Sequence, residues 1–348
     1  MEFVTCYNRD LSPRGYLEGF KSLVWTERYW EAGDFEIVFP YGASSYRGLE
    51  VGMYIQIQGT DRLMRVDTVG TLKNDDAPED ILIKGPSVEK EMFINRIVIP
   101  RRDDRDYWTM SGDASNIVNR LVRRLCIDGE DYGRDAYQNL YAETPDPSFD
   151  QITTRIRPSD LYSVMVDLSR ESKIGFRVNF DKPGRRLFFK VYRGSDRTTS
   201  QEFNVPVVFS RFLDNLRDAS YIHTHVDHFN SVYVRTGDGQ GMYVDDGSNL
   251  SGHNRRVRLL EASDVEEFSE SVARQRGLEE LAKHKCNHFF DGDASDATLY
   301  RYGGHYNMGD IVELDNEDGI RQKVRVVEYV RMVDQEGHRE YPTFEMMR

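Results

Sequence analysis

The chain has 348 residues, of which 39% are hydrophobic and 30% charged, and its formal net charge is −13. This balance is typical of a globular chain and excludes a largely disordered one. The length predicts more than one core, because single cores stop growing near roughly 250–300 residues. The negative charge disfavours adhesive binding to nucleic acid or to anionic lipid.

The start of the chain and its cysteines indicate in which compartment the chain folds. Met1–Cys6 lacks the basic and apolar regions of a signal peptide, and no apolar run reaches the roughly 20 residues of a membrane-spanning helix. The cysteines are Cys6, Cys126 and Cys286. An odd and sparse set predicts no disulfide framework, which fits folding in a reducing cytoplasm.

Residues 1–100 have the pattern of antiparallel strands. Strands are expected at Val24–Trp30 and Asp34–Phe39, where Pro40 ends the second. Gly52–Gln58 and Met64–Val69 alternate polar and apolar residues on either side of a polar turn. This region therefore predicts an antiparallel β-barrel or sandwich.

The next block, 101–203, has mixed character. It opens with the charged run Arg101–Asp106, which predicts a solvated linker. Asp113 is placed to cap a helix, and a second helix follows Pro158 and is expected to end before Gly175. A hairpin is expected between Phe176–Phe180 and Arg186–Tyr192. The apolar face of the first helix consists of Ile117, Val118, Leu121, Val122 and Leu125.

Strand character returns after residue 204 and again from 297 to the end. Strands are expected at Val205–Phe209 and His223–Val234. Between these stretches a helix is predicted to begin near Ser263, which with Glu266 forms a capping-box pattern. The fold class is therefore mainly β with α+β insertions.

A weak internal repeat links the two strand-rich regions. Gly52–Ile57 leads through a polar turn into Met64–Val69, and Gly309–Leu314 leads through a slightly longer turn into Lys323–Glu328. Each copy is a glycine turn, a strand, a hairpin turn and a second strand. Two unrelated hairpins would give the same pattern, so the sequence leaves duplication and coincidence both open.

Several stretches resemble the minor tail proteins that form the tail hub of siphophages. They are Ser22–Trp25 with Gly33–Pro40, then Gly52–Ile57, Phe209–Leu216 and Tyr306–Val312. Each match is short, but they follow one another in the family's order along nearly the whole chain. The resemblance singles out Gly33, Phe35, Gly52, Asn215, Gly309 and Asp310 as structural motif residues, with no catalytic, cofactor-binding or metal-binding residue.

The resemblance implies two related antiparallel β-barrels with two accessory domains. The first barrel would be 1–100 and an α+β accessory domain 101–203. The second barrel would be split into 204–251 and 297–348 by a helical insertion at 252–296. A homotrimer of such hubs would present six barrels in a ring that closes the tail tube.

The resemblance also implies a location and a set of partners. The partners would be the distal tail protein ring, the tape measure protein and a central fibre or tail-tip protein. DNA would pass through the channel without specific binding. The subunit would be assembled in the host cytoplasm and end in the virion tail tip. Since many relatives continue beyond the second barrel and this chain ends at Arg348, another protein would supply the fibre and any lysin.

Two other functions remain open from the sequence. A metal-dependent hydrolase could use His223, His225 and His228, of which the first two share a strand face. A carbohydrate-binding β-protein could stack sugars on some of the 20 tyrosines. The sequence contains no GxSxG, phosphate-loop or HExxH motif, so we expect no enzyme and no cofactor.

Overall fold

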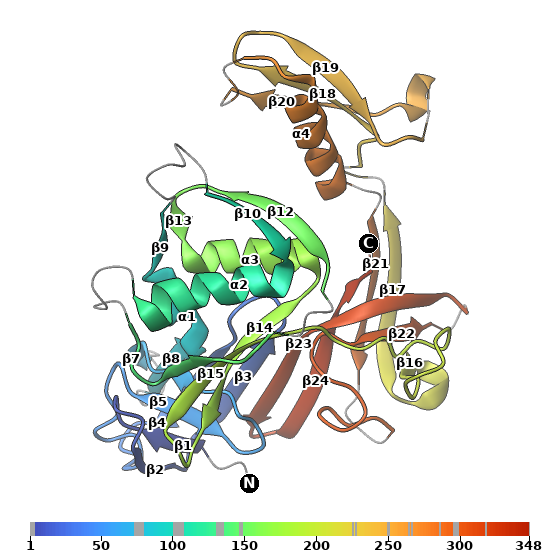
Figure 1. Ribbon diagram of the computed structural model, residues 1–348. Helices are drawn as coiled ribbons and strands as arrows, with labels where there is room; N and C mark the ends of the chain where they lie inside the picture. Colours follow the sequence, from blue (N-terminus) through green and yellow to red (C-terminus); the bar gives the residue numbers. More distant parts are fainter. Residues whose placement is uncertain are drawn as a thin grey trace. The chain divides into compact units, whose positions relative to one another are not determined.

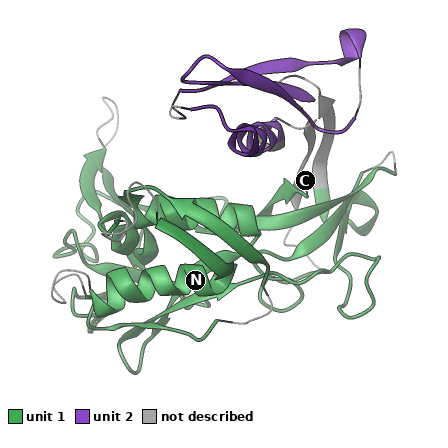
Figure 2. Cartoon of the chain, turned by 45° about the horizontal axis from the view of Figure 1, so that its top comes forward, with its two compact units in different colours: residues 1–217, 293–348 green, residues 218–292 purple. Residues whose placement is uncertain are grey.

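A computed structural model describes residues 4–72, 80–99, 108–129, 136–145, 149–224, 226, 228–248, 251–263, 265, 267–284, 287–294, 299–316 and 319–347 (Figure 1). The side chains of 217–224, 282–283 and 287–294 lie outside this description, as does the predicted linker Arg101–Asp106. The chain divides into two compact units, 1–217 with 293–348 and 218–292 (Figure 2). Among the described residues, no helix is both long and apolar enough to span a membrane.

The larger unit is organised around one sheet that contains strands from both ends of the chain. Strands β3 and β23 lie side by side in Figure 1, in antiparallel register with Arg28 opposite Glu328. The order is β16-β22-β23-β3-β4-β8-β7, and β24 also pairs with β23. The bounds are β3 Ser22–Arg28, β4 Asp34–Pro40, β7 Thr68–Leu72, β8 Asp80–Pro86, β16 Val208–Ser210, β22 Ile311–Asp315, β23 Arg321–Asp334 and β24 Gly337–Met346.

A second sheet, ordered β2-β1-β5-β6, shares a core with the first. The fully buried side chains of this core include Trp25, Phe35 and Ile55. The bounds are β1 Val4–Tyr7, β2 Pro13–Leu17, β5 Tyr54–Ile57 and β6 Met64–Arg65. The described pairings close neither sheet on itself, so the two barrels stay a prediction.

The predicted return strand Met64–Val69 is divided between the two sheets. Its first part, β6, pairs with β5, and its second part becomes β7, which pairs with β8. The change of partner occurs at Asp67, whose N–H donates to Lys84 O at 3.0 Å. Alternating polarity continues through the crossing, so it could not reveal the change of sheet.

The helical block packs around a separate core of apolar side chains. Asp113 caps the first long helix as predicted, with Oδ1 accepting from Ser115 N and Asn116 N at 2.9 and 3.2 Å. The second ends at Lys173, which takes the left-handed conformation expected of a glycine, while Gly175 begins the next strand. The helices are α1 Val88–Ile94, α2 Ala114–Val122, a π-helical turn Arg123–Asp128 and α3 Leu161–Ser172.

The longest described strands of this block form one hairpin. Its strands, β14 and β15, form the hairpin that the sequence predicts, with Phe180 opposite Leu187. The five apolar residues predicted on the face of the first helix are all buried. The bounds are β9 Ile97–Val98, β10 Trp108–Asp113, β11 Leu140–Ala142, β12 Gln151–Ile156, β13 Ser159–Asp160, β14 Gly175–Asp181 and β15 Arg186–Tyr192.

The smaller unit differs from the helical insertion predicted at 252–296. It spans 218–292 and holds a three-stranded sheet, β19-β18-β20, with one helix packed on it. The chain enters along β17 and leaves along β21, which pair with each other. The helix begins at Glu270 rather than near Ser263. The bounds are β17 Leu216–Thr224, β18 Ser231–Thr236, β19 Gly241–Asp245, β20 Val257–Ala262, α4 Glu270–Lys283 and β21 Asn287–Ala294.

Candidate functional site: the repeated glycine hairpins

The two glycine turns of the repeat have the same backbone. Gly52 and Gly309 have φ of +92° and +88°, a region that L-residues rarely adopt. Met53 N donates to Glu50 O, and Asp310 N donates to Asn307 O, each at 3.1 Å. Both are therefore four-residue turns with a left-handed glycine in third position, the arrangement of a type II turn.

The main-chain hydrogen bonds that follow are also the same. Gly52 N donates to Val66 O at 2.8 Å, and Val66 N donates back to Met53 O at 2.8 Å. In the second copy, Gly309 N donates to Val326 O at 2.8 Å, and Val326 N donates back to Asp310 O at 2.9 Å.

The strands continue in matching register. Tyr54 lies opposite Arg65 in the first copy, as Ile311 lies opposite Arg325 in the second. The copies differ at the outer edge, because β5 joins β1 in antiparallel register whereas β22 joins β16 in parallel register. The hairpin is thus the repeated element, and the strand beside it is not.

Gly309 is required by space as well as by conformation. A Cβ atom built at Gly309 would lie 2.3 Å from a ring carbon of Tyr29, whose side chain is fully buried. The same atom at Gly52 would lie 3.1 Å from the end of the Arg9 side chain, which can move. Arg325 Nη1 donates to Gly309 O at 2.7 Å with its guanidinium 5.5 Å from the Tyr29 ring centroid.

Asp310 fastens a remote segment to the second hairpin. Its carboxylate is buried and accepts from Ser195 N at 2.7 Å and from Asn307 N at 2.9 Å. It also forms an ion pair with Arg197 at 2.6 Å. This segment leads into β16, so Asp310 holds the edge of the large sheet in place. Met53 occupies the equivalent position in the first copy and is apolar.

Gly33 and Phe35 lie at the β3–β4 turn. Gly33 N donates to Ser87 Oγ at 2.9 Å, and Ser87 N donates to Gly33 O at 2.8 Å. A Cβ atom at Gly33 would lie 2.1 Å from Thr26 O. Phe35 is buried opposite Trp25, with ring centroids 6.3 Å apart. Both residues therefore serve the packing of the large sheet.

Asn215 follows the short turn after strand β16 and bonds back to that strand. Its side chain is buried, with Oδ1 accepting from Ser210 N at 2.7 Å and Nδ2 donating to Val208 O at 3.1 Å. These bonds satisfy main-chain groups that a strand end would leave unpaired. Asn215 thus stabilises the edge that Asp310 anchors from the other side.

Charged residues that the sequence pattern did not predict lie where β3 meets β23. Arg28 forms ion pairs with Asp34 and, at 2.6 Å, with Glu328. Burial alone would lower the pKa of Arg28, but the Asp34 and Glu328 carboxylates outweigh it and raise that pKa overall. The partners are 300 residues apart in sequence, so no local pattern could have identified the pair.

A second ion pair joins the sheet β2-β1-β5-β6 to the helical block. Arg62 and Glu89 are both buried and lie 2.5 Å apart. Glu89 Oε1 also accepts from Val178 N at 3.1 Å. Burial acts to lower the pKa of Arg62, but the charge of Glu89 raises that pKa overall. The pair joins two parts of the fold, as expected of residues with a structural role.

The histidine cluster is only partly within the described residues. His225 and the side chain of His223 lie outside them. His228 Nδ1 is 3.1 Å from the main-chain oxygen of His284. Within the part of the chain that the structure describes, no three His, Cys, Asp or Glu side chains are grouped for a metal ion.

The comparisons with solved structures concern the whole chain. A 43-kDa tail protein of prophage MuSo2 from Shewanella oneidensis has a TM-score of 0.59 and 12% identity, covering 99% of this chain and 98% of that one. A tail protein from Neisseria meningitidis has a TM-score of 0.56 and 12% identity, with coverage of 99% and 96%. Prophage tail protein gp18 from Listeria monocytogenes has a TM-score of 0.52 and 13% identity, with coverage of 99% and 94%. At these identities the likeness establishes a shared fold.

The family comparison covers nearly the same extent. No curated protein matches the sequence. Residues 3–344 match the family described as Siphovirus ReqiPepy6 Gp37-like protein. The chain therefore belongs to this siphovirus family and has the mainly β fold of phage tail proteins.

Proposed function

We propose that the protein is a structural subunit of the tail hub, which closes the tail tube at its tip. The observation that carries the proposal is the pair of hairpins around Gly52 and Gly309, which share their turn, main-chain hydrogen bonds and register. Internal duplication is what a three-fold ring needs to match a six-fold tube. The tail-protein fold of the chain supports the same assignment.

The proposed assembly is a homotrimer in which each chain contributes two related barrels. The first barrel is 1–100. The second combines 204–217 with 293–348, a revision that follows from the compact unit at 218–292. Residues 101–203 form the accessory domain. Gly33, Phe35, Gly52, Asn215, Gly309 and Asp310 hold the strands of these barrels in place.

The proposed partners follow from the position of a hub. One face meets the distal tail protein ring, and the other meets the central fibre or tail-tip protein. The tape measure protein ends in the channel before ejection, and DNA passes afterwards without specific binding. The subunit assembles in the host cytoplasm and performs no catalysis itself.

Light scattering on the purified protein tests the assembly, and electron microscopy of tail tips tests the location. We expect the mass of three chains and density for three copies at the end of the tube. A chain that stays monomeric at tens of micromolar and is absent from tail tips would refute the proposal.

A further inference from the structure

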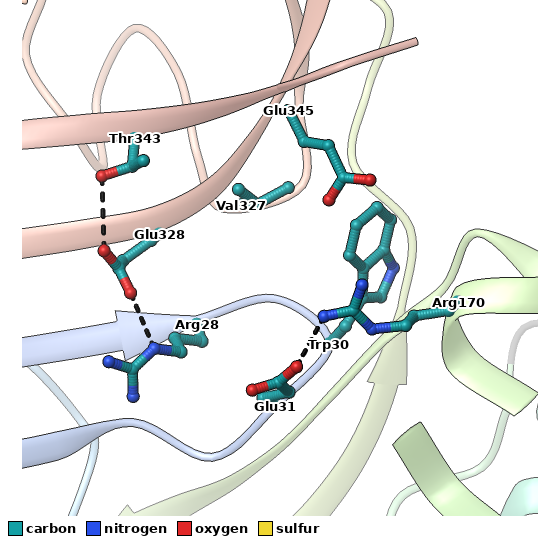
Figure 3. A pocket seen from close by; sticks show the side chains of 8 residues that line it. All are labelled: Arg28, Trp30, Glu31, Arg170, Val327, Glu328, Thr343 and Glu345. Carbon is teal, nitrogen blue, oxygen red and sulfur yellow. Dashed lines mark hydrogen bonds and ion pairs between the residues drawn. The ribbon is translucent and has the colours of Figure 1, made fainter. Parts of the chain in front are cut away.

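A polar pocket lies at an irregularity in the large sheet, where β3 meets β23. The pairing of β23 with β24 shifts between Val326 and Glu328, which leaves Val327 as a β-bulge. Tyr29 N donates to the Val327 carbonyl at 2.9 Å. Bulges redirect side chains and are frequent beside binding sites. The lining residues in Figure 3 are Arg28, Trp30, Glu31, Arg170, Val327, Glu328, Thr343 and Glu345.

The charges around this pocket do not balance. Arg28 is shared by Glu328 and Asp34, and Arg170 pairs with Glu31 at 2.5 Å. The side-chain carboxylate of Glu345 forms no ion pair or hydrogen bond with another described residue.

The arginine opposite Glu345 in the β23–β24 pairing does not form an ion pair with it. Arg325 lies opposite Glu345 and interacts with its charge, but the Arg325 guanidinium donates to Gly309 O instead. Counting Arg325 and Asp34 with the lining residues, three arginines face four carboxylates. The surplus is negative, so the pocket is complementary to a cation.

Trp30 contributes a hydrogen-bond donor to this pocket. Its indole N–H is buried and has no acceptor among the described residues. A buried donor without a partner is costly, and an acceptor that reaches it removes that cost. Arg170 already stacks 5.3 Å from the Trp30 ring centroid, so a cation on this ring has a precedent within the same pocket.

We propose that this pocket receives a lysine or arginine side chain of a partner polypeptide. The cationic group pairs with Glu345, and the aliphatic stem packs on Val327 and Trp30. A carbonyl of the incoming chain accepts from the Trp30 indole once the ring turns to present its buried N–H. That the occupant belongs to a polypeptide of the tail rests on the proposed function. The capacity to bind a basic side chain does not.

N-acetyl-L-argininamide is a suitable probe, because it carries the guanidinium together with amide carbonyls. Tryptophan fluorescence is the readout, since Trp25 and Trp108 are buried and Trp30 alone lines the pocket. We expect a saturable change at millimolar concentration that disappears in Trp30→Phe. The Glu345→Gln variant should weaken the affinity roughly threefold or more, because it removes a partly screened charge–charge interaction.

Two controls make the result specific. Glu336→Gln removes a carboxylate whose side chain is 80% exposed in the β23–β24 turn, and its affinity should equal that of the wild type. N-acetyl-L-norleucinamide, which has the stem without the charge, should produce no change. Equal affinity in Glu345→Gln, or equal binding of the norleucine compound, would overturn the inference. The titration is independent of oligomeric state, so its failure leaves the hub assignment standing.

Discussion

The two hairpins have the same main-chain geometry in different surroundings. Gly52 lies beside an exposed arginine side chain and is followed by an apolar residue, whereas Gly309 lies against the buried Tyr29 ring and is followed by a buried carboxylate. The backbone is the same in both copies, whereas the side chains around the second copy contact remote segments. The hairpin is thus the shared structural unit, and each copy is held in place by its own side-chain contacts.

The largest difference is expected for the glycines themselves. Gly309→Ala should lower the free energy of unfolding by about 4 kcal/mol, because a strained φ and overpacking against Tyr29 act together. Gly52→Ala meets only the strain and should cost about 1–2 kcal/mol. Urea unfolding followed by tryptophan fluorescence measures both, since all three tryptophans lie in the larger unit.

Equal losses of unfolding free energy in the two alanine variants would contradict the expected difference between the glycines. They would mean that Tyr29 moves aside without loss. Tyr29→Ala combined with Gly309→Ala separates the two contributions: in that background the additional cost of the alanine should fall to the value found at Gly52.

The residues after the glycines give the next largest difference. Asp310→Asn should cost about 2–3 kcal/mol, because it removes the charge that pairs with Arg197 and weakens the bond from Ser195 N. Met53→Leu, a swap of similar volume, should cost less than about 1.5 kcal/mol. Urea midpoints of the two variants test this, and a neutral Asp310→Asn would show that the segment before β16 is held by other contacts.

The arginines at equivalent strand positions should differ less. Arg325→Met should cost about 1–2 kcal/mol, since Gly309 O loses a buried donor while the desolvation of a cation is relieved. Burial lowers the pKa of Arg325 more than the nearby charge of Glu345 raises it. Arg65→Met removes half-exposed pairs with Asp67 and Glu91 and should cost less than about 1 kcal/mol. A larger cost at Arg65 than at Arg325 in the same urea assay would contradict the expected difference between the two arginines.

Local patterns were sufficient for much of this fold. The Asp113 cap, the buried face of α2, the β14–β15 hairpin and both glycine turns depend on residues close in sequence, and the sequence predicted them. Pairings that join distant segments were missed. The Arg28–Glu328 contact and the fit of Tyr29 against Gly309 depend on how strands from opposite ends of the chain meet, and spacing carries no information about that.

The bounds predicted for the helical insertion differ from those of the smaller unit for a related reason. Strand β18 alternates in the same way as a barrel strand, so the sequence assigned it to the second barrel. Only its parallel partner β20 and the packing of α4 reveal a separate core. Among the motif residues, the two glycines were identifiable from their turns. The contacts of Asp310 and Asn215 were not.

The smallest expected effect concerns DNA, and it extends the comparison to the channel that both copies would line in a trimer. A duplex carries roughly one negative charge per 1.7 Å of axis, so a basic lining would hold it and slow ejection. The surplus of 59 acidic over 46 basic residues favours an acidic or neutral lining. We therefore expect both copies to contribute a net acidic or neutral surface there, with basic side chains concentrated at subunit contacts.

Fluorescence anisotropy with labelled duplex DNA gives the first test. At 0.15 M salt we expect no binding up to roughly 100 µM protein, which is the weak end of ordinary non-specific affinity. Micromolar binding that weakens steeply with salt would mean that one copy exposes a basic surface. A trimer structure then decides where that surface lies: a channel lined mainly by lysine and arginine would refute the expectation even with the hub assignment intact, because DNA retention and free passage require opposite charges on the same wall.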